Sequence, residues 1–279
     1  MRKNGGIEMP ELPEVETIRH ALALRLCGQR VSAVTQRRPD LRFPLPARLG
    51  HRLSGRRIEA FRRRAKYILA DLDDGHSLLL HLGMSGRLVL DGPFGGPHEH
   101  LTFTFEDGSV LRFIDPRRFG MLDLWPSAAL AQHPRLAGLG LEPLGPGFDG
   151  VAIAAALLGR RSPLKIALMD QRIVVGVGNI YASESLFRAR LSPRRIAGFL
   201  RPAQARRLAL AVRAVLEDAI ASGGSSLRDY VQADGELGVF QDHFAVYDRA
   251  GLPCPACAQP IRRLVQGGRA TYFCPRCQR

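Results

Sequence analysis

The sequence predicts an α+β protein with a β-sandwich and flanking helices in its first half, a helical domain in its second half and a four-cysteine zinc ribbon at its end. Three observations lead to this fold class. Short β-rich runs with alternating apolar residues fill much of the first half. Apolar residues at helical spacing dominate the second half. Two Cys-x2-Cys pairs close the chain, whose 279 residues leave room for two domains.

The first predicted element is a helix that begins near Pro13 and ends near Gly28. Proline suits the first turn of a helix, and glycine suits its end. The apolar residues between them fall on one helical face, at Val15, Ile18, Leu22 and Leu26. Because Cys27 comes next to this face, we expect it to be a small buried hydrophobic residue without a redox role.

Residues 53–125 have the pattern of a β-sandwich. Apolar residues alternate with polar ones most clearly at 101–105, as on a half-buried strand. Acidic residues followed by glycine, at 73–75 and 106–108, are typical of tight turns between antiparallel strands.

A stretch rich in proline and glycine, residues 133–150, predicts a hinge between two domains. Helical periodicity then returns, with helices expected at 164–169, 180–187 and 202–221, the last ending at Gly223-Gly224. The expected divisions are a leader (1–9), a sandwich domain (10–132), the hinge (133–150), a helical domain (151–248) and a zinc ribbon (249–279).

The four ribbon cysteines predict one structural zinc ion. Cys254 and Cys257 form one C-x2-C pair, and Cys274 and Cys277 form the other after 16 intervening residues. This spacing suits tetrahedral Zn²⁺ bound by four thiolates. Two disulfides are the alternative, which a reducing compartment disfavours. Four protein ligands leave no coordination position for water, so the metal is expected to have no catalytic role.

The charge of the chain is unusual for its ordinary globular composition. It has 40 Lys and Arg against 26 Asp and Glu, a formal net charge of +14, and only three of the basic residues are lysines. Arginine clusters are explained most simply as solvated surface. The competing explanation is a polyanionic partner, because guanidinium groups donate paired hydrogen bonds to phosphate. A basic zinc ribbon alone is equally compatible with RNA binding.

Other partners and compartments are disfavoured by what the sequence lacks. The longest apolar runs are far shorter than the ~20 residues of a membrane span, and no basic amphipathic helix favours lipid. We therefore expect no membrane partner. Residues 1–8 lack the apolar stretch of a secretory signal, so we expect a cytoplasmic protein.

Six segments resemble, in the same order, the bacterial formamidopyrimidine-DNA glycosylases, which excise oxidised purines such as 8-oxoguanine. The segments are 9–17 (MPELPEVET), 63–67 (RRAKY), 81–86 (HLGMSG), 115–120 (DPRRFG), 176–181 (GVGNIY) and the C-terminal ribbon. The resemblance covers residues 9–279 and implies that the helical domain is a helix-two-turn-helix domain. The endonuclease VIII branch, which prefers oxidised pyrimidines, shares this architecture. The Glu-Leu-Pro-Glu-Val sequence is more similar to the purine branch.

The resemblance implies a bifunctional base excision repair enzyme, both a glycosidase (a hydrolase) and a lyase. Pro10 resembles the family's nucleophile, an N-terminal proline whose amine attacks C1′ of the damaged nucleotide. A free α-amine has a pKa of about 7.7 to 8.0, so part of it is neutral at physiological pH. Glu11 resembles the general acid/base. Lys66 and Arg269 resemble the residues assigned to β-elimination and δ-elimination, and both can neutralise phosphate charge.

The resemblance also implies contacts with double-stranded DNA that contains oxidised bases. The implied contact residues are Glu14, Met84, His98, Arg117, Phe119, Arg161, Lys165, Asn179 and Tyr181. Met84, Arg117 and Phe119 resemble the residues that fill the stack when a base is extruded. Without the resemblance, a lone Met or Phe indicates core, His98 an ordinary surface histidine and Asn179 a helix N-cap. Residues 223–247 could fold over a flipped base, and we assign no lesion-reading residue there.

The chain departs from the family pattern at its start, because the family needs this proline at the N-terminus and here nine residues precede it. A proline nitrogen in a peptide bond is a tertiary amide and cannot form an iminium. We therefore expect an active form that begins at Pro10, through a start at Met9 or removal of the leader. The alternative is a non-catalytic protein that binds damaged DNA. We further expect a bacterial, nucleoid-associated monomer without an obligate protein partner.

Overall fold

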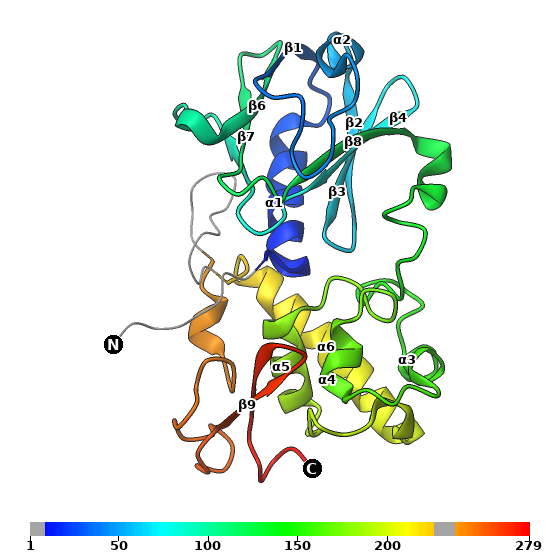
Figure 1. Ribbon diagram of the computed structural model, residues 1–279, viewed down its shortest axis with the longest axis vertical. Coiled ribbons are helices and arrows are strands. Elements are labelled where there is room, and N and C mark those ends of the chain that lie inside the picture. The colour runs from blue at the N-terminus through cyan, green and yellow to red at the C-terminus, as the bar shows by residue number, and fades with distance from the viewer. Residues whose placement is uncertain (1–8, 226–237) are drawn as a thin grey trace. The chain divides into compact units, whose positions relative to one another are not determined.

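The computed structural model describes residues 9–225 and 238–279, which form two compact units. The first unit contains the described residues up to 137, together with 223–225 and 238–239, and the second contains 138–222 and 240–279. The predicted α+β class is confirmed (Figure 1). The leader residues 1–8 lie outside the described residues, as do residues 226–237 of the expected lesion-covering segment.

The first unit is built on two four-stranded antiparallel sheets. One has the order β2-β3-β4-β8, with strands Ile58–Arg64, Tyr67–Leu72, His76–His81 and Met121–Pro126. The other has the order β1-β6-β7-β5, with strands Val31–Gln36, Glu99–Phe105, Val110–Ile114 and Arg87–Leu90. The turns predicted at 73–75 and 106–108 connect β3 to β4 and β6 to β7.

Helix α1 (Leu12–Leu26) packs on β2 and β3 of the first sheet. Its predicted apolar face is confirmed. Each of its four residues is at most 1% exposed: Val15, Ile18, Leu22 and Leu26. This face joins a single hydrophobic core with residues of both sheets, such as Ile68 and Phe113. The prediction that Cys27 is buried was wrong. The chain leaves the helix at this residue with extended backbone (φ −62°, ψ 133°), so its side chain no longer follows the buried face and is exposed.

The second unit is helical, with a two-stranded antiparallel ribbon at its end. Its elements are α3 (Gly150–Leu157), α4 (Leu164–Met169), α5 (Asn179–Arg188), α6 (Pro202–Ala221), β9 (Arg262–Gln266) and β10 (Arg269–Phe273). Helix α6 packs on α3 and α5, and α5 packs on α4 and β10. The helices predicted as α4, α5 and α6 are confirmed. Among the described helices, none is long and apolar enough to cross a membrane.

Candidate active site

The start of α1 carries the two residues that resemble the family's nucleophile and acid/base. Pro10 is half-buried, and Glu11 directly after it is 3% exposed. The backbone N–H of Glu11 donates to Glu14 Oε2 (2.9 Å), and the Glu11 carbonyl accepts the N–H of Val15 (3.1 Å). The first turn of the helix therefore fixes the backbone that follows Pro10.

Glu14 also connects this turn to residue 225 within the same unit. Its Oε1 accepts hydrogen bonds from the N–H (2.8 Å) and Oγ (3.0 Å) of Ser225. Gly224 has a φ of +81°, and a Cβ there would lie 3.1 Å from the same carboxylate oxygen, so glycine suits the position. Glu14 itself is 3% exposed. In this structure its carboxylate fixes backbone around Pro10 and Glu11.

Lys66 lies in the turn between β2 and β3. The residue before it, Ala65, has a φ of +55°, a conformation that L-residues other than glycine rarely adopt. Arg63 supports the turn, because its Nη1 donates to the Ala65 carbonyl (2.9 Å) while its Nε pairs with Glu16 (2.8 Å). Lys66 is 6% exposed, so little of the residue is accessible to solvent in this conformation.

The charge of Lys66 acts on His81, at the end of β4. Burial, and to a smaller extent the positive charges of Lys66 and Arg42, together lower the pKa of His81 from 6.5 to about 4. The backbone N–H of Gly83 donates to His81 Nδ1 (3.0 Å), so the ring proton lies on Nε2. His81 is therefore a neutral imidazole at physiological pH. Sequence reasoning placed it in a motif but gave it no role.

The three residues expected to enter the base stack lie on two neighbouring turns. Met84 belongs to the turn after β4, and Arg117 and Phe119 belong to the turn before β8. The ring of Phe119 is 40% exposed, and the Arg117 guanidinium carbon lies 4.7 Å from its centroid. Gly83 (φ +64°) permits the close approach of the turns, because a Cβ there would lie 2.4 Å from the Phe119 carbonyl carbon.

His98 is exposed at the end of a loop that a buried carboxylate holds. Glu99 accepts hydrogen bonds from Gly95 N–H (2.8 Å) and Arg112 Nη1 (3.0 Å), and Arg37 Nη1 lies 3.1 Å away. Burial raises the pKa of Glu99, but these hydrogen bonds, with that of Thr102, outweigh it and lower the pKa overall. The ionised carboxylate thus anchors the loop on which His98 stands.

In the second unit Lys165 is buried and supports Asn179. Its side chain has no exposed surface, and Nζ donates to Asn179 Oδ1 (2.6 Å), Ala270 O (2.8 Å) and Thr271 Oγ1 (2.9 Å). These bonds join α4, the start of α5 and β10. The N-cap of α5 is Gly178, so Asn179 is the first helical residue and not the cap.

The other expected contact residues of this unit differ in exposure. Arg161 and Arg269 are exposed, and Arg269 follows two glycines with positive φ in the β9–β10 turn. Tyr181 has no exposed surface and packs against Phe240, with ring centroids 5.7 Å apart. In this conformation the Tyr181 side chain packs inside the second unit and offers no exposed surface for contact with DNA.

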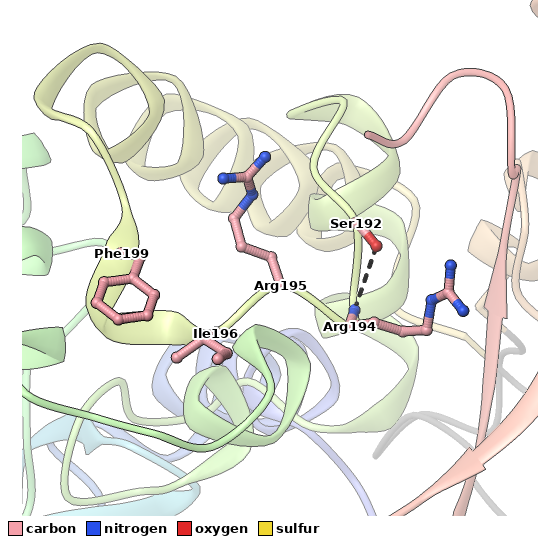
Figure 2. Close-up of a pocket in the computed structure, with 5 residues that line it drawn as sticks. All are labelled: Ser192, Arg194, Arg195, Ile196 and Phe199. Atoms are coloured by element: carbon pink, nitrogen blue, oxygen red, sulfur yellow. Dashed lines mark hydrogen bonds between the residues drawn. The ribbon is translucent and has the colours of Figure 1, made fainter.

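Figure 2 shows an open hollow of about 540 Å³ in the second unit. Its lining residues are Ser192, Arg194, Arg195, Ile196 and Phe199. Ser192 Oγ accepts the backbone N–H of Arg194 at 3.4 Å. None of the expected site residues lines this hollow, so the candidate site lies elsewhere.

The ribbon cysteines form the metal site that their spacing predicts. Their four Sγ atoms lie within 4.8 Å of one another, with 3.9 Å between Cys254 and Cys277 and 3.5 Å between Cys257 and Cys274. Tetrahedral zinc with bonds of about 2.3 Å places sulfurs ~3.8 Å apart, so the cluster fits one Zn²⁺. The Gln278 side chain accepts the N–H of Cys274 (2.8 Å) and donates to Leu191 O (3.1 Å). Gln278 thus connects the ribbon to the loop that follows α5.

Three family models match the chain in order. They describe the formamidopyrimidine-DNA glycosylase N-terminal domain (residues 9–122), its H2TH domain (139–231) and a zinc finger found in FPG and IleRS (251–279). The chain belongs to the formamidopyrimidine-DNA glycosylase family. Curated formamidopyrimidine-DNA glycosylases of Acidiphilium cryptum and Cereibacter sphaeroides are 54% and 53% identical to it, over 97% of this chain and 100% of theirs.

Solved structures agree with this assignment. The MutM (Fpg) protein of Thermus thermophilus has a TM-score of 0.86 and 45% identity, covering 96% of this chain and 98% of its own. Lactococcus lactis Fpg in complex with DNA containing an abasic site has a TM-score of 0.87 and 32% identity, covering 96% and 99%. In this formamidopyrimidine-DNA glycosylase family member, the match to the zinc finger model and the four clustered cysteines together support one structural zinc ion.

For this family member, the expected residues divide between the two units. Pro10, Glu11, Lys66 and the residues expected to enter the stack lie in the first, and Asn179 and Arg269 lie in the second. Sequence analysis did not identify Glu99, the buried carboxylate that anchors the loop of His98. Glu99 follows His98 in the sequence, but nothing in the order of residues indicates which groups its carboxylate binds.

Proposed function

We propose that the protein is a DNA glycosylase and apurinic/apyrimidinic lyase that removes oxidised purines, 8-oxoguanine and formamidopyrimidines, from duplex DNA. The observation that carries the proposal is the position of Pro10 and Glu11. They stand at the head of α1, where Glu14 fixes the backbone, in a chain that matches the family model from residue 9. The relatives with solved complexes include one bound to DNA containing Fapy-dG.

The first chemical step uses the amine of Pro10 as nucleophile. With its α-nitrogen free, the amine forms a bond to C1′, and the bond from C1′ to the damaged base breaks. Glu11 supplies a proton to the opening sugar or the departing base and later recovers one. The C1′–O4′ bond then breaks and the amine loses its proton. Because proline is a secondary amine, the product is an iminium cation without an N–H proton, which draws electrons from the sugar.

The same adduct leads to strand cleavage. Loss of a proton from C2′ releases the 3′ phosphate by β-elimination, and a second elimination releases the 5′ phosphate. Lys66 and Arg269 stabilise the charge that develops on the leaving phosphates. Arginine is a poor proton donor, so Arg269 acts electrostatically. Asn179, held by Lys165 at the start of α5, binds phosphate together with the helix N-terminus.

Removal of a base from a duplex requires its extrusion. Met84 and Phe119 fill the vacated stack, and Arg117 meets the orphaned partner base. The exposed Phe119 ring and the guanidinium beside it supply an apolar surface and a hydrogen-bond donor at one place in the first unit. His98 and Arg161 add phosphate contacts, and the positive net charge favours binding to the polyanion.

The state of the N-terminus provides the test. Protein that begins at Pro10 should be trapped by borohydride on duplex carrying 8-oxoguanine opposite cytosine, because hydride reduces the iminium to a stable amine. Protein that retains residues 1–9 should not be trapped. An intact-mass measurement on protein from its native host establishes which form exists there.

Other outcomes select other functions. A blocked Pro10 in the native protein, with tight binding to damaged duplex, would indicate a non-catalytic DNA-binding protein. Faster release of oxidised pyrimidines than of oxidised purines would indicate an endonuclease VIII-like enzyme. Equal trapping of the unprocessed chain, with the adduct at another residue, would refute the proline nucleophile.

The proposed substrate also determines where the protein acts. Chromosomal DNA places it at the nucleoid in the bacterial cytoplasm, where four zinc-binding thiolates stay reduced. Every proposed role is assigned to residues of one chain, so the proposed activity requires no second copy of the chain.

A further inference from the structure

The two turns that carry the proposed wedge residues are joined by one buried carboxylate. Residues 82–86 connect β4 to β5 and residues 115–120 connect β7 to β8, so each turn passes from one sheet of the sandwich to the other. Asp115 has no exposed surface. Its Oδ1 accepts a hydrogen bond from Ser85 Oγ (2.6 Å), and its Oδ2 accepts one from the N–H of Gly120 (2.7 Å).

Ser85 completes the connection between the turns. Its Oγ also accepts the backbone N–H of Arg117 at 3.1 Å, so one hydroxyl contacts both the carboxylate and the backbone of the second turn. The Asp115 carbonyl accepts hydrogen bonds from His100 Nε2 (2.8 Å) and the N–H of Arg118 (3.2 Å). Arg118 has a φ of +57°, so these bonds hold the second turn in a conformation that an arginine rarely adopts.

We propose that Asp115 and Ser85 are positioning residues for base extrusion, an inference that rests on the proposed function. Together they fix the turn that carries Met84 against the turn that carries Arg117 and Phe119 before DNA arrives. Neither Asp115 nor Ser85 enters the stack. Because the wedge is already ordered, its insertion requires little further loss of conformational freedom.

A positioning role predicts a selective defect. Loosening the two turns should slow the step in which the base leaves the stack. It should not slow the elimination chemistry once that step is bypassed, and it should not weaken non-specific binding to phosphates. A bond that only stabilises the fold would instead affect every activity in proportion to the loss of folded protein.

The test compares Ser85→Ala, which removes the hydroxyl, with Ser85→Thr, which keeps it. Ser77→Ala is the matched control, because Ser77 Oγ donates to Asp71 at the same 2.6 Å from near the other end of β4. Asp115→Asn is a second variant that keeps an acceptor for Gly120 but loses the acceptor for the Ser85 hydroxyl. Thermal melting confirms that each variant is folded.

Two substrates separate extrusion from chemistry. Both are used with zinc-loaded protein whose N-terminus is in the form that releases the damaged base. The first is a duplex with 8-oxoguanine beside 2-aminopurine, whose fluorescence follows unstacking in stopped flow. The second is a duplex with a preformed abasic site. We expect Ser85→Ala to slow unstacking about tenfold, the effect of losing one hydrogen bond to a charged group. Cleavage of the abasic duplex and affinity for undamaged duplex should stay at the parent level, and Ser85→Thr should restore unstacking.

Three results would overturn the inference: equal slowing on both substrates, an equal defect in Ser77→Ala, or parent-like unstacking in both Ser85→Ala and Asp115→Asn. A parent protein that cleaves neither substrate would instead refute the proposed function, and the positioning role with it. The two failures are therefore distinguishable.

Discussion

His81 shows how a single, largely enclosed histidine can be kept neutral beside a lysine. Its folded-state pKa of about 4 lies below the ordinary value of 6.5, so the unfolded chain binds more protons between these values. Stability therefore falls as the pH decreases from 6.5 toward 4, by roughly 3 kcal/mol for this group.

We expect nitrogen-detected NMR to show His81 neutral and protonated on Nε2 at pH 6. In Lys66→Met the apparent pKa of His81 should rise but stay below 6.5, because burial is the larger cause and only one positive charge is removed. A charged His81 at pH 6 in the parent protein would contradict the assignment.

Glu99 adds a further loss of stability at lower pH, in the same direction as His81. Its pKa is lowered from 4.5, so its ionised form stabilises the fold above pH 4.5 and this stabilisation is lost as the pH falls below that value. Glu99→Gln should flatten the decline of stability below pH 4.5, measured by denaturant unfolding at several pH values. Glu106→Gln, which changes an exposed acid paired with Arg30 at 3.9 Å, is the control and should leave the decline intact. Identical profiles in the parent and Glu99→Gln would refute the role.

At the scale of elements, the zinc ribbon is the segment that depends most on a bound group. It is too small to bury a core of its own, so its four ligands hold it together. We expect Cys274→Ser or chelation to unfold the ribbon and abolish DNA binding, while far-UV circular dichroism retains most of its helical signal.

Cys27→Ser is the matched control, because it changes an exposed cysteine outside the cluster. The parent protein should contain about one equivalent of zinc by metal analysis, since four thiolates saturate one ion. Full DNA binding with less than about half an equivalent would contradict the prediction.

The elements differ in how well the sequence predicts them, for physical reasons. Helices α1 and α6 each bury one stripe of apolar residues within their own unit, so their periodicity is visible in the sequence. Strand β1 is exposed over most of its length, and α3 is apolar all round and only 8 residues long, so neither shows a clear pattern. Asp115 and Glu99 each bind a nearby backbone N–H and also side chains from distant parts of the sequence, and no local pattern contains those distant partners.

The whole molecule carries its charge as arginine, and that charge should govern its affinity for undamaged DNA. The logarithm of affinity should fall linearly with the logarithm of salt concentration, by about 0.9 for each phosphate neutralised. Fluorescence anisotropy with a short duplex measures this slope. Arg161→Ala should reduce it by about one contact.

Arg188→Ala is the control for this experiment, because Arg188 is already paired with Asp218 at 2.7 Å. An affinity that does not change with salt would mean that the net charge of +14 is only solvated surface. A slope reduced equally by both variants would show that Arg161 makes no phosphate contact of its own.

The near absence of lysine has a practical consequence for chemical labelling. The described residues contain two lysines, Lys66 and Lys165, which are 6% and 0% exposed. In protein that begins at Pro10, an acylating reagent aimed at amines would therefore meet one accessible target, the terminal proline nitrogen. The rate of acylation against pH would report the basicity of that nitrogen directly in the intact protein, and competition by DNA would show when the nitrogen is covered.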